Sequence, residues 1–187
     1  IDTDLRSSKY DGGAISPPCR SMSGLREKSG QDGGPRVLRD PDGPGLYGRK
    51  DLWPEEKELI RTDNLLFCRS GQMADRFLEM GPIKDNQGKD HWAPWVLEQP
   101  KFWKERNRPH AYKLKWLSHL INHIAVEDED ICQCNAGAPT AKPTTLRGTI
   151  STKIGTNCEH AKCWWVVPWS GRSYFSAHPR LEGRQWA

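Results

Sequence analysis

The clearest periodic pattern of apolar and polar positions runs from Pro109 to about Val126. Apolar residues recur there three and four positions apart, at Leu114, Leu117, Leu120, Ile121 and Ile124. This spacing predicts an amphipathic helix whose apolar stripe faces a core. The acidic run 127–130 follows directly, and acids oppose the dipole at a helix C-terminus, so we expect the helix to end by about Val126.

Two further helices are predicted earlier in the chain. The first covers Asp51–Ile60, where Pro54 suits the first helical position and Glu55 and Glu56 suit the first turn. The second begins at Ser70 as its N-cap and stops at the Gly and Pro of positions 81 and 82.

A loop is predicted between Asp85 and Pro100, because Pro94 and Pro100 interrupt any helix or strand ladder there. Trp92 and Trp95 are its expected buried rings.

The character of the chain changes at Ile131. Thr144–Ile154 is rich in β-branched residues and predicts a strand, and Trp164–Val167 predicts a second one. The expected fold is α+β with extensive irregular structure. It comprises an extended arm (1–50), a helical segment (51–130) and a small β module with a C-terminal tail (131–187), which a Cys/His cluster staples.

The predicted arm contains nine Gly and five Pro, and its apolar residues follow neither a helix nor a strand period. Such a segment cannot offset its own ordering entropy, so we expect it to be disordered alone and ordered only by a partner surface.

Composition and charge favour a protein-bound role. Only 35% of residues are hydrophobic, yet nine are Trp, which suits buried rings or interfaces. The formal charge is +4 without a basic block, so nucleic acid is permitted but not required. No apolar run approaches the roughly 18 residues of a membrane span. The chain opens with Ile1, so we expect an upstream segment to have been removed, as in a processed organellar or secreted protein.

Four of the six cysteines form the strongest candidate site. The spacing is Cys132-x-Cys134, then 23 residues, then Cys158-x-His160-x2-Cys163. Tetrahedral zinc takes four sulfur or nitrogen ligands, commonly as two close pairs. We predict a structural zinc held by the four cysteines, with His160 as an alternative ligand. Disulfides, unligated thiols and an iron–sulfur cluster are the other interpretations.

Two short resemblances bear on this cluster. The segment from Cys158 to Cys163 resembles the first ligand box of Rieske proteins, but no Cys follows Cys163, so the second box is missing and a Rieske cluster is excluded. The cysteine pairs are similar to those of the peripheral zinc-binding subunit of cytochrome oxidase. The second pair there is C-x2-C, whereas here it is C-x4-C, so only the zinc-binding logic is shared.

Other candidate sites are better explained by structure or interfaces. His119, His123 and Glu127 would share one helix side and could hold a metal, but a solvated or partner-facing stripe is the preferred interpretation. The residues Trp164, Trp165 and Trp169 could stack bases, but packing is favoured. Phosphate-loop, dinucleotide and nucleophile-elbow motifs are absent.

We therefore expect no enzyme, but a peripheral accessory subunit of a large mitochondrial assembly, a respiratory-chain or ATP-synthase complex first. Its partners would be other protein subunits. The alternatives are a mitochondrial ribosomal protein, in which nucleic acid would be a partner, and a small metal-binding redox protein.

Overall fold

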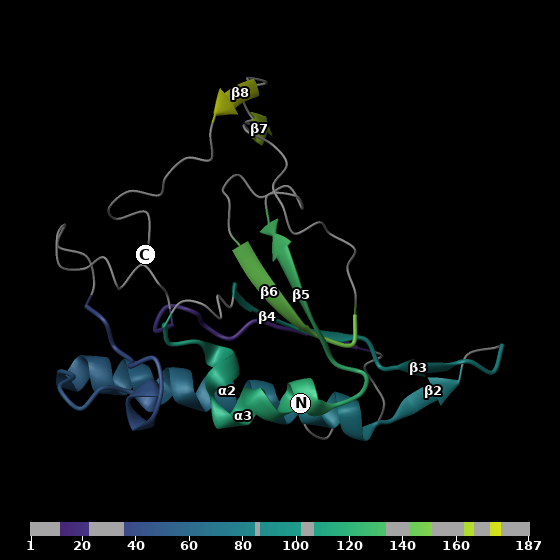
Figure 1. Cartoon of the computed structure of the whole chain (residues 1–187), viewed down its shortest axis with the longest axis horizontal. Helices are drawn as coiled ribbons and strands as arrows, with labels where there is room; N and C mark the ends of the chain where they lie inside the picture. The colour runs from purple at the N-terminus through teal and green to yellow at the C-terminus, as the bar shows by residue number, and fades with distance from the viewer. Residues whose placement is uncertain are drawn as a thin grey trace.

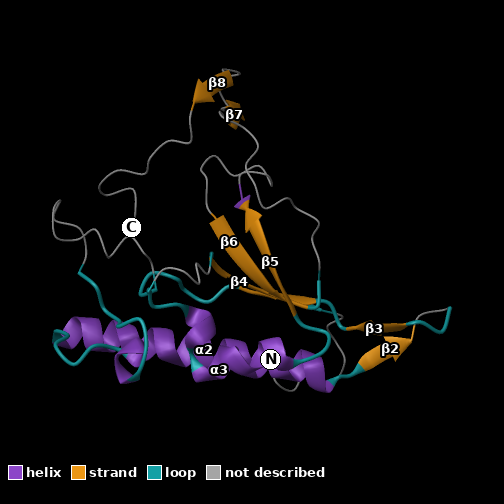
Figure 2. Cartoon of the chain, viewed as in Figure 1, coloured by secondary structure: helices purple, strands orange, loops and turns teal. Residues whose placement is uncertain are grey.

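One long helix lies beneath a four-stranded sheet (Figures 1 and 2). The computed structural model describes residues 12–22, 36–84, 87–101, 107–133, 143–150, 163–166 and 173–176. The helices are η2 (Pro44–Tyr47), α2 (Pro54–Glu79), η3 (Ala111–Lys113), α3 (Lys115–Ser118) and η4 (His119–Asn122). The strands are β1 (Gly13–Ile15), β2 (Pro82–Lys84), β3 (Asp90–Trp92), β4 (Trp95–Pro100), β5 (Glu127–Cys132), β6 (Pro143–Gly148), β7 (Cys163–Val166) and β8 (Ser173–Ser176).

The main sheet has the order β1-β4-β6-β5. β1 runs parallel to β4, whereas β6 is antiparallel to both β4 and β5. Two separate hairpins are formed by β2 with β3 and by β7 with β8. The mixed α+β content confirms that part of the predicted fold class.

The start of α2 agrees with its sequence signals. Pro54 is the first helical residue, and the Trp53 backbone N–H donates to Glu56 Oε2 at 2.9 Å. The prediction of a second helix capped by Ser70 is wrong, because α2 continues through this residue. The Ser70 hydroxyl donates instead to the Leu66 carbonyl, one turn back in the same helix, at 2.8 Å.

The predicted helix over Pro109–Val126 is broken into η3, α3 and η4. Three of its apolar positions are buried as expected, namely Leu114, Leu117 and Leu120. Ile121 and Ile124 are instead 41% and 93% exposed. The backbone is extended at Leu114, which separates η3 from α3, and again at His123, which ends η4, so one continuous apolar stripe is not formed and Ile124 lies outside any helix.

The prediction of a loop from Asp85 to Pro100 is wrong, since β3 and β4 lie within it. Pro94 falls between the two strands and Pro100 is the last residue of β4, so neither proline interrupts a strand. Trp95 is fully buried, as expected, and Trp92 is half-buried.

Both predicted C-terminal strands are present with shorter or shifted bounds. β6 lies within Thr144–Ile154 apart from its first residue, and β7 overlaps Trp164–Val167. β6 occupies a central place in the main sheet, between β4 and β5.

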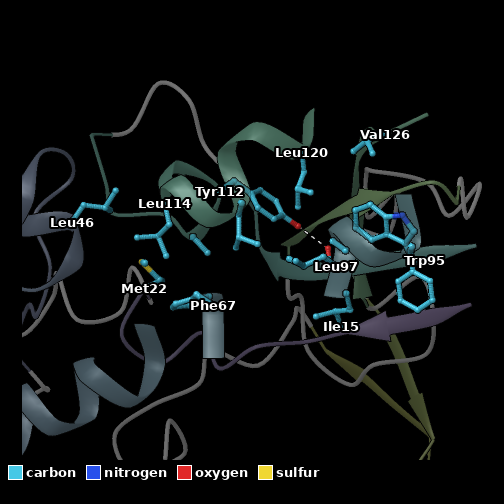
Figure 3. Packing of buried hydrophobic residues seen from close by; sticks show 14 of the residues in the cluster. Ile15, Met22, Leu46, Phe67, Trp95, Leu97, Tyr112, Leu114, Leu120 and Val126 are labelled. Atoms are coloured by element: carbon cyan, nitrogen blue, oxygen red, sulfur yellow. Dashed lines mark hydrogen bonds between the residues drawn. The ribbon is translucent and has the colours of Figure 1, made fainter. Parts of the chain in front are cut away.

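The apolar core lies between the sheet and the helices (Figure 3). Residues of the predicted arm contribute to it: Ile15 is 5% exposed and Leu46 4%, and both belong to a cluster with Phe67 of α2 and Trp95 of β4. For these described residues, part of the covering surface comes from the same chain, and the expected role of a partner in ordering the arm stays a prediction.

A buried charged centre also ties the early segments to α2. The Arg39 side chain donates to Ser21 Oγ at 3.1 Å and to Asn64 Oδ1 at 2.8 Å. Arg20 donates to the buried carboxylate of Asp63 at 3.2 Å. Burial lowers the pKa of Arg39 to about 10, and the nearby Asp63 carboxylate opposes this change. These contacts join residues 20–21 and 39 to one helix.

Candidate interaction surface

Arg147 of β6 clamps together the two ends of a surface loop. It lies opposite Asp128 in the β5–β6 register, and its Nε and Nη2 donate to the two Asp128 carboxylate oxygens at 2.7 and 2.8 Å. Its Nη1 donates to the Leu117 carbonyl of α3 at 2.9 Å. A two-pronged pair of this kind fixes orientation as well as distance. Residues 117 and 128 are thereby held by a single guanidinium group.

The ring of Tyr112 packs against the guanidinium group of Arg147 and supports it. The Arg147 guanidinium carbon lies 4.1 Å from the centre of the Tyr112 ring, a cation–π contact. Two carbonyl oxygens can share the single proton of the buried Tyr112 hydroxyl, that of Leu97 at 2.7 Å and that of Thr145 at 3.0 Å, and the shorter bond is drawn in Figure 3. Burial raises the pKa of Tyr112 well above its usual value, so the hydroxyl stays a donor.

His110 is a second structural group in this network. Its Nδ1 accepts from the Tyr112 backbone N–H at 3.1 Å, which assigns the proton to Nε2, 2.6 Å from the Pro100 carbonyl. Burial lowers the pKa of His110 from 6.5 to about 4, so the ring is neutral near pH 7. Its two nitrogens are therefore occupied in joining η3 to β4.

Residues 119–126, here called the Ile124 loop, run between the clamped ends. The loop is pinned to the core by Leu120, 1% exposed, and by Val126, 5% exposed. Its turn closes through the Val126 N–H, which donates to the His123 carbonyl at 3.0 Å, and the Ala125 N–H, which donates to His123 Nδ1 at 3.1 Å. Its backbone is therefore fixed at several points.

Two side-chain contacts attach the Ile124 loop to neighbouring elements. His119 Nε2 lies 2.8 Å from Asp75 Oδ1 of α2. The His123 ring packs edge-on against Trp92 of β3, with ring centres 4.7 Å apart and planes at 87°. The loop thus rests on α2 and on the β2–β3 hairpin, which extends away from the sheet in Figure 1.

Of the four exposed residues of the Ile124 loop, Ile121 and Ile124 are apolar, and His119 and Asn122 are polar. Ile124 is 93% exposed and Ile121 is 41% exposed, on a backbone that buried neighbours hold in place. Elsewhere on the described surface, large exposed apolar side chains include Trp53, Leu65 and Ile83. Ile124 is the most exposed of those the structure describes. Single exposed apolar residues are common, but a nearly free Ile on a clamped turn is a candidate contact point.

The residues predicted as a possible second metal site do not form one. His119 contacts Asp75, His123 contacts Trp92, and Glu127 begins β5, so the three do not share one helix side. Over the described part of the chain, no three His, Cys, Asp or Glu side chains are grouped to hold a metal.

The predicted zinc ligands lie largely beyond what the structure describes. Cys134, Cys158 and His160 are outside the described residues, and for Cys132 and Cys163 only the backbone is described. The isolated Cys19 and Cys68 are free thiols and half-buried. The zinc site stays a prediction.

Sequence reasoning missed the clamp because its parts are far apart in the chain. One signal was available: Arg147 stands in a predicted strand, and the acidic run 127–130 could supply its partner across a strand pair. Interpreting the acidic run as the end of a helix hid this pairing.

Comparison with family models, with curated proteins and with solved structures finds no match to the chain. None of the helices described here is long and apolar enough to cross a membrane.

Proposed function

We propose that this chain is a non-catalytic accessory subunit that attaches to a larger protein assembly, with a mitochondrial respiratory-chain or ATP-synthase complex as the leading candidate. The observation that carries the proposal is the Ile124 loop, where two isoleucines stand exposed on a fixed backbone. A rigid loop loses little conformational entropy on binding, so its apolar area contributes more fully to affinity.

The chemistry-bearing side chains around the loop support a structural role. Arg147, Asp128, Tyr112 and His110 bond to one another or to backbone carbonyls and amides of the same chain. Their arrangement holds the loop in shape, and in this proposal that is their task.

The test isolates the native protein. The full-length chain, tagged at its C-terminus in its own cells, is followed through a native density gradient with the candidate complexes. We expect it to sediment with one of them at a constant ratio and to stay there in moderate salt, since salt screens interactions between charges and does not weaken apolar contacts. Sedimentation as a free chain of its own mass would refute the proposal, and release by moderate salt together with RNA would favour the ribosomal alternative.

A further inference from the structure

The acidic start of β5 lies directly beside the Ile124 loop. Glu127 follows the loop immediately and is exposed, and Asp128 beside it is held by Arg147 with its side chain still 29% exposed. The exposed Ile121 and Ile124 are therefore followed in the chain, after the buried Val126, by two carboxylate groups, of which that of Asp128 is paired with Arg147.

From this pattern we infer that the Ile124 loop docks into an apolar pocket of a protein partner, with Lys or Arg side chains at the pocket border next to Glu127. The inference rests on the proposed function and names the docking element and the chemistry of its partner. Interfaces bury apolar groups at their centre and place charges at their rim, which corresponds to Ile124 and Glu127 here. Complementary charge at the rim sets orientation and speeds association.

The hydrogen bonds of Arg147 hold the Ile124 loop in one conformation before a partner binds. Arg147 fixes both ends of the loop, and His119 and His123 attach it to α2 and β3. Because the side chain of Ile124 makes few contacts within the chain, its replacement leaves these supports in place. Loss of binding can thus be separated from loss of folding.

The experiment compares matched surface variants of the full chain in the native assembly. Ile124→Asp is the test, and Leu65→Asp is the control, because Leu65 is 54% exposed on α2, outside the Ile124 loop. We expect Ile124→Asp to lower the assembly-bound fraction at least tenfold, as for an interface hot spot, and Leu65→Asp to leave it unchanged. Unfolding midpoints within error of the wild type would show that both variants fold.

A second arm tests the charge at the border. Glu127→Lys should weaken binding severalfold and Glu127→Gln less so, whereas Glu58→Lys on exposed α2 should have no effect. A photo-crosslinking residue at position 124 should label an apolar partner peptide that contains Lys or Arg.

The outcomes separate the two proposals. If the wild type sediments with an assembly but Ile124→Asp does so equally, the docking site is refuted and the accessory role stands. An acidic crosslinked peptide, or stronger binding by Glu127→Lys, would refute the basic border. If the wild type never joins an assembly, the accessory role and the docking site both fall.

Discussion

The neutral, buried His110 makes the stability of the fold depend on pH. In the folded chain its pKa is about 4, against 6.5 for the free side chain, because burial penalises the charged ring. Between these values the unfolded chain binds a proton and the folded chain does not, so acid favours unfolding. The contribution is complete above about pH 6.5 and is lost progressively as the pH falls towards 4.

The magnitude follows from the difference of 2.5 between 6.5 and about 4. Each tenfold change in proton affinity corresponds to about 1.4 kcal/mol, so the unfolding free energy should fall by about 3 kcal/mol over this range. The ring is 6% exposed, so solvent screens little of this effect.

The assay is urea unfolding at pH 7.5, 6, 5 and 4.2, with His110→Asn as the matched variant. Asn does not titrate here and can still accept the Tyr112 N–H as an N-cap. The variant should be less stable at pH 7.5, since it loses the bond to the Pro100 carbonyl. Its stability should decline less than that of the wild type on acidification, because the buried ring of His110 no longer contributes to the decline.

Equal declines in the wild type and His110→Asn would refute the reasoning, since the wild-type excess is assigned to one ring. His119→Asn is the control, because His119 is exposed and its removal should leave the excess intact.

Three further predictions concern Arg147, the close approach of Gly71 in α2 to Trp116 in α3, and the cysteines. Arg147→Met should lower the unfolding free energy by about 2 to 3 kcal/mol, measured by urea, because Asp128 and the Leu117 carbonyl lose their donor; an unchanged value would contradict the clamp. Gly71→Ala should lower the unfolding free energy by about 1 to 3 kcal/mol, because the new Cβ would lie 2.1 Å from the Trp116 carbonyl oxygen. This is the opposite of the usual effect of Ala in a helix. Stabilisation in thermal unfolding would show that α2 and α3 are less tightly packed at this point. Native protein should contain one zinc per chain by elemental analysis, with all six thiols free. A chelator should then unfold the C-terminal segment. Absence of metal together with only two free thiols would instead indicate disulfides among Cys132, Cys134, Cys158 and Cys163.

Local signals predicted the local structure well. Pro54 and Glu56 marked the start of α2, and the spacing of Leu114, Leu117 and Leu120 identified buried positions. Each of these features depends on neighbours within a few residues, which the sequence displays directly.

The sheet was harder to predict from the sequence, because the strands that pair in it lie far apart in the chain. β4 pairs with residues 13–15 and 144–148, and no local pattern in 95–100 reveals either partner. Periodicity also marked Ile121 and Ile124 as apolar positions without showing what covers them. The Ile124 loop could be identified only once the path into β5 was known.

The position of β5 has a consequence for solubility. Among the described strands it is an edge of the main sheet, and edge strands are templates for pairing between molecules. Its first four residues, 127–130, are all acidic. Two copies meeting along this edge would bring two such runs, eight carboxyl groups in all, to one seam, and like charges on adjacent strands repel. The acidic residues 127–130 therefore disfavour edge-to-edge pairing of two copies through β5 and so oppose the growth of fibres.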